Sequence, residues 1–197
     1  MRRIVTNFNQ EGKSVFASEG KPQRIVTFES IPGFELNEIW ATDSIPSLPV
    51  EKSDPTEKTE SFVPNTGGTC FRIIRIPPEQ DILKAVEAGL DMSNARQEYI
   101  DKAPGLGDSH EIENQGMHTT DTVDYIIVIS GEVWLELDDG AETHLKQGGL
   151  RCAERNPACL EKPGIRAMYH SCCYDRCKSF VKQFSKLFCE QLKMIDY

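Results

Sequence analysis

The residues best suited to chemistry are His118, Thr120 and Asp124, which lie close together just before an alternating apolar run. Because side chains of an extended segment alternate between its two faces, positions 118, 120 and 124 can turn toward one side. Imidazole and carboxylate groups are ligands for divalent first-row metal ions, and either group can also transfer protons. The spacing therefore indicates a candidate site at this point of the chain.

The stretch from Gly116 to Gly149 must position these residues. Two alternating apolar runs, 125–129 and 132–137, flank Ser130-Gly131, and Asp138-Asp139-Gly140 closes the second run. Alternation interrupted by Ser-Gly and Asp-Gly is the pattern of hairpin strands. We expect a β-meander in which Asp124 faces inward.

Two further regions offer candidates for a pocket. Alternation over 34–41 places Glu38 and Trp40 on one face of a predicted strand. If that face is internal, Glu38 is a candidate catalytic acid or base and Trp40 a pocket residue. Otherwise Glu38 is a carboxylate at the rim of the sheet. Trp134 is a third pocket candidate, or an ordinary core residue.

The spacing resembles the first motif of the cupin superfamily. That motif reads His-x-His, three or four residues, Glu, six residues and Gly. His118 takes the place of the first His, Thr120 replaces the second, Asp124 replaces Glu, and Gly131 follows at the expected distance. The segments 34–43 and 67–73 are also similar to small stand-alone cupins, so the resemblance covers residues 1 to about 149.

The resemblance implies a mainly β fold, a jelly-roll barrel with one site inside. In it, His118 and Asp124 bind a divalent first-row metal ion (Fe, Mn, Ni, Cu or Zn). The ion is expected to be weakly bound or absent, because Thr120 is a poor ligand. The implied function is a metal-dependent oxidoreductase or tailoring enzyme acting on a small organic substrate, with Trp40, Thr120 and Trp134 in the pocket.

Two other functions stay open. The first is a non-redox decarboxylase, dehydratase or isomerase of the cupin type, with Asp124 or Glu38 as general base. The second is a metal-free cupin that binds a small ligand without catalysis. Aerobic against anaerobic turnover after Fe(II) reconstitution separates redox from non-redox chemistry.

The chain changes character at residue 149. Six of its seven cysteines lie beyond this point, and the segment has neither the alternation nor the second His-containing motif of a cupin. We therefore divide the chain into a cupin-like domain, 1–148, and an atypical Cys-rich tail, 149–197, expected to be helical or irregular. A barrel that ends at residue 148 is incomplete and leaves an unpaired sheet edge.

A shift of reading frame explains the tail. When Gly149 onward is back-translated and read one nucleotide later, permitted codons spell DCVVQNGTQHAWKNPGSEQCIILAVMIAV. This string contains the missing Asp after Gly148, an Asn-Gly turn, a His with an Asn four places later, and a closing apolar strand. We hypothesise a one-base insertion in a run of G bases at Gly148-Gly149.

Apolar patterning predicts the remaining elements. Strands are expected at 2–8, 14–18, 23–29 and 71–76, with a surface loop without a motif at 44–66. Ile82, Leu83, Val86 and Leu90 predict a short helix within 81–99, a candidate lid over the barrel.

Composition restricts the partners. A net charge of −9 and a pI near 5.0 argue against nucleic acid and anionic membrane, since phosphate binding requires clustered Lys and Arg. No signal peptide or membrane span is evident, so we expect a cytoplasmic protein with reduced cysteines. A small-molecule substrate is the expected partner, and a homodimer is left open.

Overall fold

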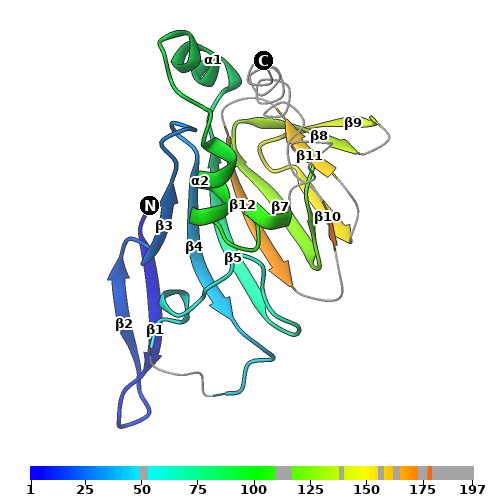
Figure 1. The fold of residues 1–197 in the computed structure, drawn as a ribbon. Coiled ribbons are helices and arrows are strands. Elements are labelled where there is room, and N and C mark those ends of the chain that lie inside the picture. Colours follow the sequence, from blue (N-terminus) through cyan, green and yellow to red (C-terminus); the bar gives the residue numbers. More distant parts are fainter. Residues whose placement is uncertain are drawn as a thin grey trace.

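The computed structural model describes most of the 197-residue chain. The described residues are 1–48, 53–109, 117–137, 140–154, 158–161, 165–172 and 177–178. The fold is mainly β, as the sequence predicted (Figure 1). Among the described helices, none is long and apolar enough to cross a membrane.

Strands account for most of the described elements. They are β1 (Arg3–Phe8), β2 (Ser14–Gly20), β3 (Arg24–Thr27), β4 (Glu35–Thr42), β5 (Thr69–Ile76), β6 (Thr119–Thr120), β7 (Val123–Ser130), β8 (Glu132–Leu137), β9 (Glu142–Lys146), β10 (Leu150–Glu154), β11 (Ala158–Glu161), β12 (Ile165–Cys172) and β13 (Cys177–Lys178). The helices are α1 (Glu79–Glu87) and α2 (Ala95–Lys102), with short 3-10 turns at Pro55–Glu57 and Gly107–Ser109.

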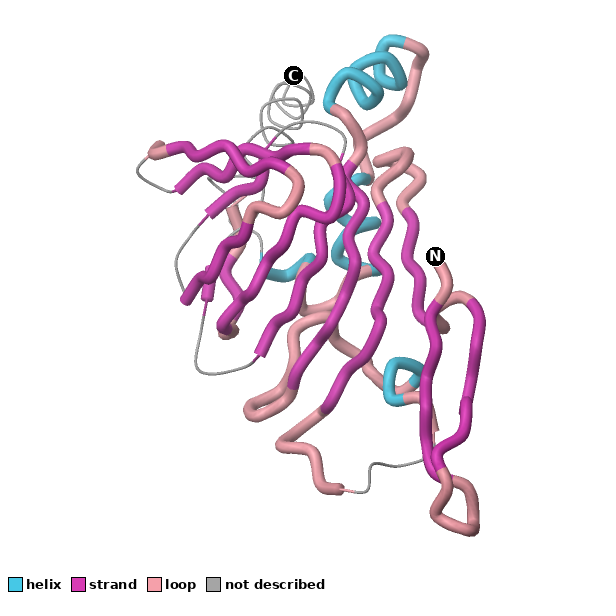
Figure 2. The backbone as a smooth tube through the Cα atoms, turned by 180° about the vertical axis from the view of Figure 1, so that it is seen from behind, coloured by secondary structure: helices cyan, strands magenta, loops and turns pink. Residues whose placement is uncertain are grey.

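The strands form one large sheet and smaller ones. Six strands pair in the order β10-β7-β12-β5-β4-β3, and three pair in the order β11-β8-β9. Figure 2 shows β1 and β2 as a hairpin beside this arrangement. A single apolar cluster joins Ile126 and Val128 of β7 to Val133 and Leu135 of β8. The described strands pair as separate sheets and not as one closed barrel.

We expected β7 and β8 to pair as a hairpin, and the structure corrects this. β7 pairs with β10 and β12, whereas β8 pairs with β9 and β11, so Ser130-Gly131 carries the chain from one sheet to the other. Gly131 has φ +78°, a conformation that a sheet-crossing corner and a hairpin turn can both use. The second turn is as expected: Gly140 has φ +80°, and β8 and β9 pair as a hairpin.

The segment beyond residue 149 contains strands where we expected a helical or irregular tail. β12 lies inside the large sheet, between β5 and β7, and β10 pairs with the other edge of β7. We expected a chain that ends its barrel at residue 148 to leave a sheet edge unpaired, but β10 and β12 pair with both edges of β7. Strand pairing uses backbone groups that every sequence supplies, so it does not decide the reading frame. Residues 179–197 lie outside the described part of the chain.

The predicted helix within 81–99 is two helices. α1 ends near Gly89, whose φ of +96° stops a right-handed helix, and α2 begins at Ala95. Tyr99 of α2 packs against Phe28 and Phe34, with ring centroids 5.1 and 6.0 Å away. This aromatic contact places α2 over the large sheet, beside the strands that carry the candidate site (Figure 1).

A bulge in β4 changes which residues share a face. Glu38 lies opposite Arg72 of β5, but the register shifts before Trp40, which lies opposite Phe71. Consecutive residues of a strand lie on opposite faces, and in β5 Arg72 is buried whereas Phe71 is half-buried. The expectation that Trp40 shares a face with Glu38 is wrong, because simple alternation fails at an inserted residue.

Candidate functional site

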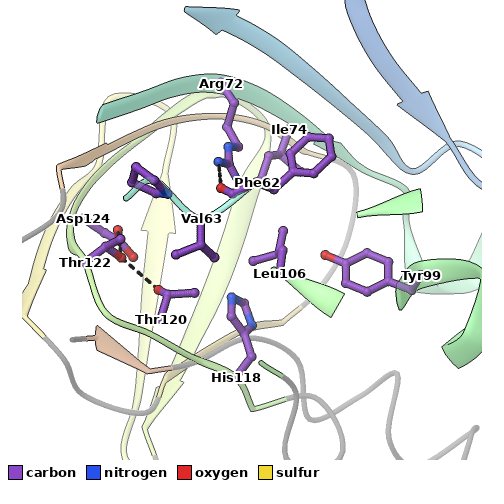
Figure 3. Close-up of a pocket in the computed structure, with 11 residues that line it drawn as sticks. Phe62, Val63, Arg72, Ile74, Tyr99, Leu106, His118, Thr120, Thr122 and Asp124 are labelled. Atoms are coloured by element: carbon purple, nitrogen blue, oxygen red, sulfur yellow. Dashed lines mark hydrogen bonds between the residues drawn. The ribbon is translucent and has the colours of Figure 1, made fainter. Parts of the chain in front are cut away.

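A pocket opens where the His118 segment meets the large sheet (Figure 3). Its enclosed part measures about 30 Å³, room for one or two water molecules or a carboxylate group, and the empty space that includes its open mouth is about 410 Å³. Apolar and polar side chains line it from four parts of the chain. They are Phe62, Val63, Pro64, Arg72, Ile74, Tyr99, Leu106, His118, Thr120, Thr122 and Asp124.

Three of the predicted site residues meet in this pocket. His118, Thr120 and Asp124 all line it, and all three come from one short segment that runs through β6 into β7. His118 is 7% exposed and Thr120 is 8% exposed, so both side chains are screened from bulk water. Ile126 and Val128 follow Asp124 at inward positions of β7 and extend into the core.

A chain of hydroxyl groups orients Asp124. The Thr122 hydroxyl donates to Asp124 Oδ1 at 2.8 Å, and the hydroxyls of Thr120 and Thr122 lie 2.8 Å apart. A hydroxyl has one proton to donate, so Thr122 must accept from Thr120. The chain therefore runs from Thr120 to Thr122 to Asp124 and fixes one carboxylate oxygen within the pocket.

These side chains do not by themselves form a metal centre. His118 and Asp124 are two strong ligands, whereas protein metal sites of this kind use at least three. Within the described residues, no group of three or more His, Cys, Asp or Glu side chains could hold one ion. The guanidinium of Arg72 lines the same pocket and would repel a dication.

Behind the pocket, Arg24, Glu38 and Arg72 lie side by side on β3, β4 and β5. Glu38 is fully buried, so it is not a rim carboxylate, and it does not line the pocket directly. Its Oε2 lies 3.7 Å from Arg72 Nε. Burial raises the pKa of the Glu38 carboxyl, against the opposing effect of the two guanidinium groups.

Cys70 lies two residues before Arg72 on the same buried face of β5. Burial raises its pKa to about 11, so it is a neutral thiol at physiological pH. Burial alone would lower the pKa of Arg72, but Glu38, Cys70 and Asp124 together outweigh it and raise that pKa above its ordinary value. Arg72 is therefore a permanent cation at the pocket wall.

Two predicted pocket residues lie elsewhere. Trp40 and Trp134 are not among the residues that line the pocket. Trp134 lies on β8 of the three-stranded sheet, where its ring stacks on His144 of β9 with centroids 3.9 Å apart. Asp124 and His118 are thus brought together, and the two tryptophans are not.

The structure adds pocket residues that the sequence interpretation did not select. Phe62 and Pro64 belong to the segment 44–66, which was read as a surface loop, yet both are buried and line the pocket. Arg72 was missed inside a predicted strand. An arginine at an inward position between Cys70 and Ile74 was the available signal, since buried cations usually have a role.

Comparisons with known proteins identify no family. No family matches the sequence, and no curated protein matches it. An ethanolamine utilization protein Q from Salmonella typhimurium LT2 is 8% identical with a TM-score of 0.36, covering 87% of this chain and 95% of that one. A EutQ protein from Clostridium difficile is 9% identical with a TM-score of 0.35, covering 86% and 94%. Likenesses at this level assign neither family nor function.

Proposed function

We propose that this protein is a cupin-type enzyme that binds a small organic molecule in the pocket and moves a proton on it without redox chemistry. Decarboxylation, dehydration and isomerisation are the reactions of this class. The cupin assignment is supported by the spacing of His118, Asp124 and Gly131 and by the mainly β fold.

The observation that carries the proposal is the oriented carboxylate of Asp124. A general base must first be held in position, and here the Thr122 hydroxyl holds one oxygen. Asp124 takes a proton from a carbon or oxygen atom of the substrate. In an isomerisation, Asp124 or His118 returns a proton at a second position, so the atoms balance without a co-reactant.

Hydrogen exchange in D₂O tests this function. The protein is incubated with small organic acids and ketones, and proton NMR records loss of the substrate C–H signal. Asp124→Asn keeps the shape and the hydrogen bond to Thr122 but removes the base, so exchange should fall at least about a hundredfold. Asp121→Asn is the matched control, because Asp121 is exposed in the same loop.

A second outcome separates the alternatives. Unchanged exchange in Asp124→Asn contradicts the assigned role of Asp124. Binding by the wild-type protein with no exchange or turnover supports the metal-free ligand-binding alternative instead.

A metal-dependent oxidoreductase is the second candidate, because His118 and Asp124 line one pocket as that function requires. It needs a third ligand from outside the described residues. Elemental analysis after anaerobic Fe(II) loading tests it: one tightly held metal ion per chain, lost in His118→Ala, supports this candidate.

A further inference from the structure

Arg72 is a cation with more N–H donors than the described structure supplies with acceptors. The residue is 4% exposed and lines the pocket, and its guanidinium carries five N–H donors. Within the described part of the chain it donates to one oxygen atom, from Nη2 to the backbone carbonyl oxygen of Phe62, and the Cys70 thiol is its other hydrogen-bond partner (Figure 3). Arg72 Nε is buried without a hydrogen-bond acceptor.

Glu38 does not complete this set of contacts. Its nearest oxygen is 3.7 Å from Arg72 Nε, which is an ion pair but too long for a hydrogen bond. Among the described residues, neither Glu38 carboxylate oxygen accepts a hydrogen bond from an N–H or O–H group, and the Cys70 thiol is the neighbouring donor. Glu38 also lies between Arg72 and Arg24 in the sheet, so its charge is divided between two cations, and Asp124 is the second acid whose charge acts on Arg72.

The carboxylate of a ligand would supply the hydrogen-bond acceptors that Arg72 lacks. Two carboxylate oxygens accept from the planar fork of a guanidinium in a bidentate pair, which no single neutral carbonyl can do. Arginine donors left unsatisfied in a buried site are costly, and such a ligand would relieve that cost. The Thr122 hydroxyl already holds Asp124, so that carboxylate is not aligned on Arg72 by a hydrogen bond.

The rest of the lining fits an apolar body. Phe62, Val63, Pro64, Ile74 and Leu106 supply ring and aliphatic surface around the polar groups. Transfer of an apolar ring or branched chain from water to such surface is favourable. The pocket therefore combines one unsatisfied guanidinium with apolar walls.

We infer that the substrate is a small carboxylic acid with an aromatic or branched apolar body, and that Arg72 binds its carboxylate. This inference rests on the proposed function for its choice of pocket. It makes Arg72 the residue that determines specificity, while Asp124 performs the proton transfer.

Calorimetric titration of the full-length protein with benzoate and benzamide tests the inference without any mutation. The two probes have the same ring and nearly the same shape, but only benzoate is a carboxylate. Benzoate should bind at least tenfold more tightly. Equal affinities, tighter benzamide, or no binding of either probe overturns the inference.

Variants locate the effect. Arg72→Lys keeps a positive charge but loses the fork, so benzoate affinity should fall at least tenfold with benzamide unchanged. Arg75→Lys is the matched control on the exposed face of the same strand and should change neither. Equal weakening of both probes by Arg72→Lys indicates a structural role and overturns the assignment.

Failure of the proposed function can be distinguished from failure of the Arg72 inference. Benzoate binding that survives in Asp124→Asn, together with unchanged proton exchange, rejects the proposed function but keeps the Arg72 inference. Should Arg72→Lys fail to fold by circular dichroism, the comparison of benzoate with benzamide on the wild-type protein still decides the matter.

Discussion

A single threonine hydroxyl holds the carboxylate on which the proposed chemistry depends. Thr122 is 2% exposed and bridges Thr120 and Asp124, so its removal leaves two polar groups without their partner. Buried polar groups that lose a partner destabilise the folded state, because the unfolded chain keeps its hydrogen bonds to water.

Thr122→Val preserves the shape of the side chain and removes the hydroxyl. We expect the free energy of unfolding in urea to fall by about 1–3 kcal/mol. Thr119→Val is the control: Thr119 Oγ1 is buried and has no hydrogen-bond partner in the described structure, so its loss should be neutral or slightly stabilising. Equal destabilisation by both variants contradicts the hydroxyl chain.

Sequence patterning selected His118 and Asp124 as candidates because one precedes and the other begins a clear alternating run. It could not locate Arg72 in the same way, since the role of an inward arginine depends on Phe62 and Glu38, which are distant in sequence. Trp40 shows the other limit. One inserted residue in β4 reverses the face of every later side chain, and alternation contains no signal for it.

At the scale of elements, α2 is fixed to the loop after β3 by one carboxylate. Glu98 accepts from the backbone N–H groups of Glu29 and Ser30 at 2.7 and 2.9 Å, from the Ser30 hydroxyl, and from Lys102 Nζ at 2.6 Å. Partial burial alone would raise the pKa of Glu98, but these hydrogen bonds lower it to about 2. The helix that carries Tyr99 into the pocket lining therefore depends on an ionised Glu98.

The sign of the pH dependence follows from this lowered pKa. The stabilisation is fully present above the ordinary value near 4.5 and is lost as pH falls toward 2. At neutral pH, Glu98→Gln should lower the free energy of unfolding by about 2 kcal/mol, and the difference from wild type should shrink below pH 4.5. Urea titrations from pH 7 to pH 3 measure it.

An exposed residue provides the comparison for this prediction. Glu87→Gln on α1 should track the wild-type protein at every pH. A constant difference between Glu98→Gln and wild type from pH 7 to pH 3 contradicts the role of the ionised carboxylate.

At the scale of the whole molecule, Arg3 attaches the hairpin β1–β2 to β4 and to the loop that follows it. Arg3 is 7% exposed, donates from Nη1 to the carbonyl oxygen of Ile39 at 3.0 Å, and forms an ion pair with Asp54. Asp54 also accepts from the backbone N–H of Thr56 at 3.0 Å. The neighbouring Arg2 forms an exposed pair with Glu19.

Arg3→Met should release the hairpin, because it removes the hydrogen bond to Ile39 and leaves the partly buried Asp54 without its cationic partner. We expect amide hydrogen exchange in β1 and β2 to accelerate about a hundredfold, corresponding to about 3 kcal/mol. Arg2→Met should change these rates less than about threefold, since exposed pairs contribute little. Similar exchange in the two variants contradicts the attachment through Arg3.

The segment beyond residue 149 bears on the gene as well as on the fold. Its backbone supplies β10 and β12 to the large sheet, and the reading frame decides which side chains these strands carry. Transcript sequencing around Gly148-Gly149 should reveal a run of G bases and a second frame with a cupin-like His motif. A chain in the restored frame should unfold at higher urea concentration. Absence of that frame rejects the hypothesis.

A crystal structure with 4-bromobenzoate tests the central claim most directly, because anomalous scattering locates the bromine and density shows the carboxylate. The account predicts one molecule in the pocket, with its carboxylate on Arg72, its ring against Phe62 and Leu106, and Asp124 facing it. Bromine outside this pocket at saturating concentration, or a carboxylate turned away from Arg72, would contradict it.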